Sequence, residues 1–265
     1  MLTVFSSTGC IRCEIVKKYL RRESIPFTEW DVKTDEGREA FKVFYRRRRA
    51  EVRRDDRGIF FPVVLDGETV VQDAGLTLAW LLAGEALCEA VVPNNLGHGW
   101  TGGLYTGRCG SEFNAVFLRV VRLLKNGGLR TECQADGRNP ALLEALLQEK
   151  LMDRLRFAVL PAADSGQDQR ESLRLAGEHA HELEMIFYTD IAVRTARGGD
   201  MLSVTEVAEA ARLLREATGN GALAYAVCAG APELGVNLLQ YRTAARRWQT
   251  RAELVQAMPG MLEPE

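Results

Sequence analysis

The feature that most constrains this chain is a pair of cysteines placed where a short strand gives way to a helix. The apolar run at residues 2–5 predicts the strand. The helix that follows has apolar residues at helical spacing, Ile15, Val16, Tyr19 and Leu20. Cys10 lies at its N-terminus, where unpaired backbone amides and the helix dipole favour a thiolate. We predict that Cys10 is a nucleophile and that Cys13, one turn later, resolves a mixed disulfide formed on it.

Two other interpretations compete for this cysteine pair. A zinc site needs a second pair of cysteines or histidines at similar spacing. No other cysteines or histidines have that spacing. The remaining ones are Cys88, Cys109, Cys133, Cys228, His98, His179 and His181. Two inert core cysteines are the other alternative, which the strand-then-helix context disfavours. We therefore expect a redox pair and no bound metal.

Composition narrows the class of protein. The 265 residues are 46% hydrophobic and 26% charged, as in a folded globular chain. The net charge of −2 gives no general attraction to nucleic acid or to an anionic membrane. No apolar run is long enough to span a bilayer. Six cysteines are too few for a disulfide scaffold, so we expect a cytoplasmic protein whose disulfide is transient.

Residues 1–86 predict one α/β domain. After the first strand and helix we expect a strand, a long helix, a hairpin and a final helix, at residues 25–32, 35–54, 59–71 and 75–83. Asp66-Gly67 marks the hairpin turn. The long helix carries a basic run at residues 46–49, with acidic residues interleaved after it. We interpret this run as a solvated helix face, with the docking of an acidic partner protein as the alternative.

This order of elements resembles the thioredoxin fold and, within it, the glutaredoxin-like redoxins. The residues that carry the resemblance are Cys10-Ile11-Arg12-Cys13, Phe61-Pro62-Val63, Asp66-Gly67 and Val71-Gln72-Asp73. In that family the proline before the hairpin is cis and lies beside the active-site disulfide, where neighbouring backbone pairs with an extended substrate. The resemblance implies catalysis by Cys10 and Cys13 without a cofactor. It also implies a substrate-binding set of four residues, Thr8, Phe61, Pro62 and Asp73.

Two departures from the family bear on the substrate. Glutaredoxins usually carry a lysine three residues before the first cysteine, where this chain has Ser7. They usually follow the hairpin with Gly-Gly-x-Asp, where this chain has Val71-Gln72-Asp73. Both family features hold glutathione. The Ile-Arg pair between the cysteines is closer to the redoxins that serve ribonucleotide reductase, so we expect a protein disulfide as substrate and a reductase protein or glutathione as electron donor.

Residues 87–99 read as a linker, residues 100–239 as a second domain, and residues 240–265 as a C-terminal helix and tail. The second domain alternates strands with helices. Its predicted strands are at residues 100–105, 129–133, 155–160, 184–193 and 223–228. Its predicted helices are at residues 112–124, 140–149, 169–181 and 204–217. This alternation predicts a mainly parallel α/β layer, either an open sheet or a partial barrel.

Within the second domain, residues 123–137 resemble the radical S-adenosylmethionine activating enzymes in their spacing and apolar pattern. Residues 142–155 and the Ile186-Phe187-Tyr188-Thr189 strand continue the likeness. The family's Cys-x-x-x-Cys-x-x-Cys motif is missing, and Gly107-Arg108-Cys109-Gly110 replaces its Gly-Gly-Glu-Pro. The resemblance implies a degenerate partial barrel without cluster or cofactor. We expect Cys109 and Cys133 near strand ends, as core thiols.

Three functional hypotheses follow. The first is a dithiol–disulfide oxidoreductase in which the second domain recognises the partner protein. The second is a non-catalytic adaptor that keeps a relic redoxin fold. The third is an iron–sulfur carrier in which Cys10 is a ligand across a dimer.

Overall fold

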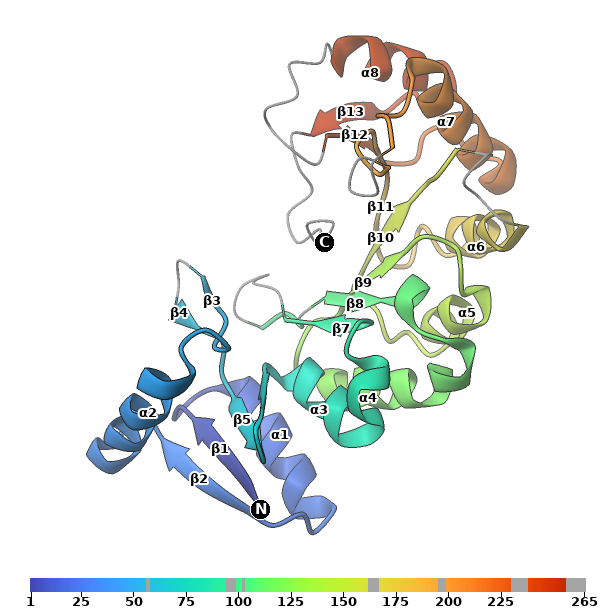
Figure 1. The fold of residues 1–265 in the computed structure, drawn as a ribbon. Coiled ribbons are helices and arrows are strands. Elements are labelled where there is room, and N and C mark those ends of the chain that lie inside the picture. Colours follow the sequence, from blue (N-terminus) through green and yellow to red (C-terminus); the bar gives the residue numbers. More distant parts are fainter. Residues whose placement is uncertain are drawn as a thin grey trace. The chain divides into compact units, whose positions relative to one another are not determined.

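The computed structural model describes residues 1–55, 58–93, 99–101, 103–161, 167–194, 199–229 and 238–255 of an α/β chain. It divides into two compact units, and Figure 1 colours the chain by residue number. Unit 1 comprises Met1–Leu104 with Glu112–Thr131, and unit 2 comprises Tyr105–Ser111 with Glu132–Glu265. No helix in the described part of the chain is long and apolar enough to cross a membrane.

Unit 1 is built on a four-stranded sheet. Its strands are β1 (Leu2–Ser6), β2 (Phe27–Asp31), β5 (Val63–Asp66) and β6 (Thr69–Gln72), in the spatial order β2-β1-β5-β6. β1 pairs with β2 in parallel, whereas the β1–β5 and β5–β6 pairs are antiparallel. Two further antiparallel pairs are short: β3 (Arg54–Asp55) with β4 (Gly58–Ile59), and β7 (Val91–Val92) with β8 (Gly103–Tyr105).

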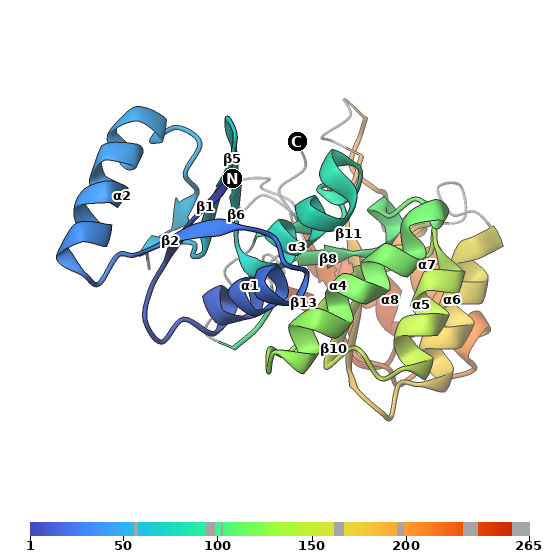
Figure 2. The ribbon, with the colours of Figure 1, turned by 90° about the horizontal axis from the view of Figure 1, so that it is seen from below.

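Helices cover both faces of the unit 1 sheet, as Figures 1 and 2 show. They are α1 (Ile11–Arg22), α2 (Asp35–Arg48) and α3 (Ala74–Ala83). Helix α4 (Asn114–Asn126) packs against α3, and Gly84–Leu87 is a short 3-10 helix. Side chains of β1 alternate between the faces. Phe5 packs against Phe44 of α2, with ring centroids 4.9 Å apart. Ser6 points the other way, to a polar group that includes Lys17 of α1. Helices α1 and α2 therefore lie on opposite faces.

The C-terminal end of α4, where Gly127 and Gly128 stop the helix, packs against α1. A Cβ atom on Gly127 would overlap the side chain of Ile15 in α1. Gly128 has a φ of +90°, which a residue with a side chain rarely adopts. Arg119 of α4 also pairs with Glu23 at 3.1 Å. Sequence reasoning placed residues 112–124 in the second domain, but these contacts group α4 with unit 1.

Unit 2 contains five parallel strands in sequence order. They are β9 (Glu132–Ala135), β10 (Arg154–Ala158), β11 (Glu184–Asp190), β12 (Tyr225–Cys228) and β13 (Ala252–Val255). Helices between successive strands are α5 (Pro140–Gln148), α6 (Gln167–Glu178), α7 (Val204–Thr218) and α8 (Leu238–Arg246). Each of these helices contacts the next, so they form one layer along the sheet (Figure 1). Two 3-10 helices, Thr106–Arg108 and Ser111–Phe113, precede α4.

The alternation of strands and helices confirms the predicted α/β class, with local differences. The predicted strand at residues 100–105 is β8, which runs antiparallel to β7. The fifth parallel strand is β13, in a region that sequence reasoning assigned to a C-terminal helix. The helix predicted at residues 35–54 ends at Arg48, and β7 lies inside the range 87–99 expected to be a linker. β7 and β13 have two and four residues, too few for a period to be read, so backbone pairing decides them.

Candidate active site

Cys10 and Cys13 form a disulfide at the start of α1, with their Cα atoms 5.3 Å apart. Cys10 is the N-cap residue, and its sulfur accepts a hydrogen bond from the Cys13 backbone amide at 3.2 Å. Cys10 is half-buried, whereas Cys13 is 0% exposed. The structure thus brings the two predicted catalytic residues together and leaves only Cys10 within reach of a partner. An amide directed at the Cys10 sulfur also favours its thiolate after reduction.

Pro62 and Phe61 precede β5. The Phe61–Pro62 peptide bond is cis, and Pro62 is buried. The Pro62 carbonyl accepts a hydrogen bond from the Asp73 amide at 3.0 Å. The Phe61 ring packs against Phe41 of α2, with centroids 5.5 Å apart, on the sheet face opposite α1. The Phe61 side chain therefore does not point toward the disulfide. Only the backbone of Phe61 is placed to contact a substrate there.

Asp73 is a buried acid rather than an open ligand. It caps α3 by accepting a hydrogen bond from Gly75 N at 3.0 Å, and its φ of +68° lies in the left-handed region. Its second carboxylate oxygen lies 3.2 Å from Nη1 of Arg12. Only 1% of Asp73 is exposed. Burial raises the pKa of the Asp73 carboxyl, while the Arg12 charge and the amides of Gly75 and Ala74 act in the opposite direction.

Arg12 is the site residue that sequence reasoning missed. It lies between the two cysteines, and Nη2 donates a hydrogen bond to the Trp100 carbonyl at 2.6 Å while Nη1 pairs with Asp73. Arg12 therefore connects the start of α1, the start of α3 and residue 100. One signal was present in the sequence. A cation in the first turn of a helix opposes the dipole, so it calls for a specific acidic partner.

Thr8 is exposed in the loop before Cys10, but internal bonds engage its polar atoms. The Thr8 amide donates to Oδ1 of Asp31 at 3.2 Å, and the Thr8 hydroxyl donates to Oδ2. Nζ of Lys33 donates to the Thr8 carbonyl at 2.7 Å. The hydrogen bond from the Thr8 side chain is the main reason why the pKa of Asp31 lies below its usual value. Thr8 therefore holds the loop that presents Cys10.

A polar network joins α1 to the sheet one turn beyond Cys13. Nζ of Lys17 pairs with Glu14 at 2.6 Å and with Glu29 of β2 at 2.7 Å, and Ser6 donates to Glu29 at 2.6 Å. Burial lowers the pKa of Lys17, but the hydrogen bonds to Glu14 and Glu29 outweigh it and raise the pKa overall. This network fixes α1 on the sheet beneath the disulfide. Ser6 and Glu29 are distant in sequence from one another, so no sequence motif indicates this network.

The cysteines of unit 2 are core thiols. Cys133 is the second residue of β9 and is 0% exposed, so it does not lie at the strand end that we expected. Cys109 is buried after a 3-10 helix, and its thiol donates to the Gly110 carbonyl at 3.4 Å. Burial raises the pKa of the Cys228 thiol well above its usual value. Within the described ranges no three His, Cys, Asp or Glu side chains gather as a metal site.

Unit 2 holds a buried group of paired charges on neighbouring strands. Glu132 of β9 is 1% exposed and contacts Arg154 at 2.9 Å and Arg156 at 3.1 Å, both on β10. Arg154 also pairs with Glu184 of β11 at 2.9 Å. These charges compensate one another across adjacent strands, so we interpret them as structural.

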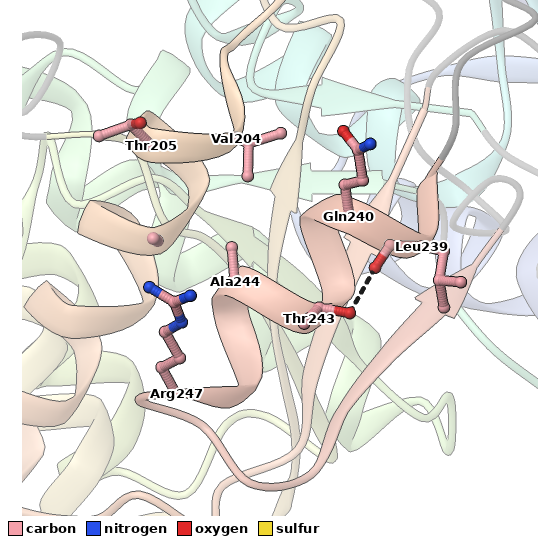
Figure 3. Close-up of a pocket in the computed structure, with 8 residues that line it drawn as sticks. Val204, Thr205, Leu239, Gln240, Thr243, Ala244 and Arg247 are labelled. Atoms are coloured by element: carbon pink, nitrogen blue, oxygen red, sulfur yellow. Dashed lines mark hydrogen bonds between the residues drawn. The ribbon is translucent and has the colours of Figure 1, made fainter.

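A hollow of about 550 Å³ lies between α7 and α8 in unit 2 (Figure 3). It is lined by Val204, Thr205, Ala208, Leu239, Gln240, Thr243, Ala244 and Arg247. The Thr243 hydroxyl is engaged by the Leu239 carbonyl at 2.8 Å, as Figure 3 shows. The lining contains no cysteine, histidine or carboxylate. Its threonine hydroxyls therefore have no base in the lining to activate them, and the Cys10–Cys13 region remains the best candidate active site.

The Cys10–Cys13 disulfide, Arg12 and Asp73 form one local site, and no single sequence motif contains all of them. Comparisons of the chain with protein-family models, with curated proteins and with solved structures found no match.

Proposed function

We propose that the chain is a dithiol–disulfide oxidoreductase that acts on a protein disulfide, and that unit 1 is a thioredoxin-like domain of the glutaredoxin type. The observation that carries the proposal is the Cys10–Cys13 disulfide at a helix N-terminus, with Cys10 half-buried and Cys13 fully buried. The β2-β1-β5-β6 order and the position of Pro62 directly before β5 support the fold assignment.

The reaction needs only the two cysteines and an external thiol donor. In the reduced chain the Cys10 thiolate attacks one sulfur of the substrate disulfide, which breaks and releases a substrate thiolate. Cys13 then loses its proton and attacks the Cys10 sulfur in the mixed disulfide, which releases the second substrate thiolate. Two electrons pass from the cysteine pair to the substrate, and each substrate thiolate takes up one proton. A reductase protein or glutathione restores the dithiol.

A protein disulfide is favoured over glutathione because the acid expected to hold glutathione is engaged. Asp73 is 1% exposed and pairs with Arg12 of the same chain. A glutathione amino group would have to displace that guanidinium from a buried position. Ser7 also supplies no cation for a glutathione carboxylate. The site therefore suits a substrate that binds through backbone near Pro62 and through a wider surface.

For unit 2 we propose a degenerate partial barrel that recognises the partner protein. The five parallel strands in sequence order support this assignment. The thiols Cys109, Cys133 and Cys228 are each buried.

The proposal is tested by reduction of a protein disulfide with dithiothreitol as donor. We expect Cys10→Ser to abolish turnover, because the nucleophile is gone. We expect Cys13→Ser to accumulate a mixed disulfide with the substrate protein, visible by non-reducing electrophoresis. Cys88→Ser is the matched control, because Cys88 is a half-buried free thiol, and it should leave the rate unchanged. Turnover by Cys10→Ser at the wild-type rate would overturn the proposal.

A further inference from the structure

We infer that two segments of unit 1, residues 99–101 and 128–130, form a cationic wall beside the disulfide, and that Arg130 binds a carboxylate of an acidic segment in the substrate protein. This inference rests on the proposed function, because it names the class of protein that the same site accepts. We call these two segments the Arg130 wall.

The backbone of the Arg130 wall is held by two hydrogen bonds. Arg130 N donates to the Gly99 carbonyl at 2.7 Å, and Thr101 N donates to the Arg130 carbonyl at 2.8 Å. This pattern is a parallel bridge between Trp100 and Arg130, which puts their side chains next to each other. The Arg130 guanidinium carbon lies 4.0 Å from the centre of the Trp100 ring. Stacking of this kind restrains the guanidinium while its N–H groups remain directed outward.

The Arg130 wall borders the cysteine motif itself. The Trp100 carbonyl accepts the hydrogen bond from Arg12, which lies between the cysteines. A Cβ on Gly128 would lie 3.4 Å from Cδ1 of Ile11, the other residue between the cysteines. Ile11 is 41% exposed. A protein chain that reaches the Cys10 sulfur therefore passes close to this wall.

Arg130 is a cation without a carboxylate partner among the described residues. It is exposed, and its described contacts are the Trp100 ring and the backbone of residues 99 and 101. Other cations near the motif are engaged within the chain. Arg12 is paired with Asp73, and Nζ of Lys33 donates to the Thr8 carbonyl. A fixed guanidinium with free donors matches a carboxylate in two-point geometry. The expected ligand is an aspartate or glutamate a few residues from the substrate cysteine.

The test uses the full chain and two disulfide-bonded peptides that differ only in the residues beside their cysteines, glutamate in one and lysine in the other. We expect the wild-type chain to reduce the glutamate peptide with a kcat/KM about five-fold higher, the scale of one partly exposed charge pair. Arg130→Gln should remove this preference and Arg130→Glu should reverse it. The preference should also fall as salt is added. Arg47→Glu is the control, because Arg47 is an exposed arginine of α2, on the opposite face of the sheet from α1, and it should change nothing.

The outcomes separate this inference from the proposed function. If wild type reduces both peptides equally well, the inference is wrong and the oxidoreductase proposal stands. If the preference for the glutamate peptide persists in Arg130→Glu, a different surface selects the substrate. The inference about the Arg130 wall is then also wrong. If wild type reduces neither peptide and no protein disulfide, the proposed function fails and the inference falls with it.

Discussion

The Arg12–Asp73 pair makes a strong prediction about stability. Arg12→Met keeps most of the side-chain volume but leaves the Asp73 carboxylate without its cation. Asp73 is 1% exposed, and the Arg12 side chain is 15% exposed. Removing one partner from a buried pair costs about 3–5 kcal/mol, because the other charge is left uncompensated. The lost hydrogen bond to the Trp100 carbonyl adds about 1 kcal/mol.

The loss of stability caused by Arg12→Met should depend on pH, and it should be smaller at low pH. Burial raises the pKa of Asp73, so the folded chain binds this proton more tightly than the unfolded chain does. The stability linked to protonated Asp73 is therefore present at low pH and is lost as pH rises through the folded pKa. Without Arg12 that pKa rises further. The destabilisation of Arg12→Met should shrink as pH falls, by up to about 1.4 kcal/mol per pH unit.

The assay is urea unfolding of the oxidised chain at pH 8 and pH 5, with far-UV circular dichroism as the signal that reports unfolding. It compares wild type, Arg12→Met, Asp73→Asn and the double variant. We expect the double variant to recover most of the loss caused by Arg12→Met at pH 8, because the uncompensated charge is gone. Arg119→Met is the control, since Arg119 forms an exposed pair with Glu23 and should cost less than about 1 kcal/mol. Additive losses, or a loss that is equal at both pH values, would refute the reasoning.

The remaining predictions also concern stability and use the same urea unfolding measurement. Glu132→Gln should lower the free energy of unfolding by about 3 kcal/mol, because it removes the buried carboxylate that contacts both Arg154 and Arg156, whereas Glu184→Gln on the same network should cost under about 1 kcal/mol. Equal losses would show that burial does not govern this network. Gly127→Ala should cost about 1–3 kcal/mol, because its Cβ overlaps Ile15, and Ile15→Val should relieve part of that cost. A Gly127→Ala chain as stable as wild type would disprove the close approach of α4 to α1.

The site was partly predictable from local sequence. Cys10 and Cys13 were found because a helix N-terminus and a spacing of three residues are both readable along the chain. Asp73 was named from the resemblance, but its role changed, since the structure engages it with Arg12 rather than leaving it open to a ligand. The Trp100–Arg130 bridge was not predictable, because its two residues are thirty positions apart and neither belongs to a motif.

The sequence by itself determined the α/β class, most helix positions and the cysteine pair, because apolar periodicity, caps and turn residues act over a few neighbouring positions. In the structure, Ser203 caps α7 and bonds reciprocally with Glu206, an interaction of this local kind. Only the tertiary structure decided which face of the sheet Phe61 occupies, that β13 joins β12, and that α4 belongs to unit 1. It also decided what Arg12 binds. These outcomes depend on contacts between distant segments, whose energies no local pattern encodes.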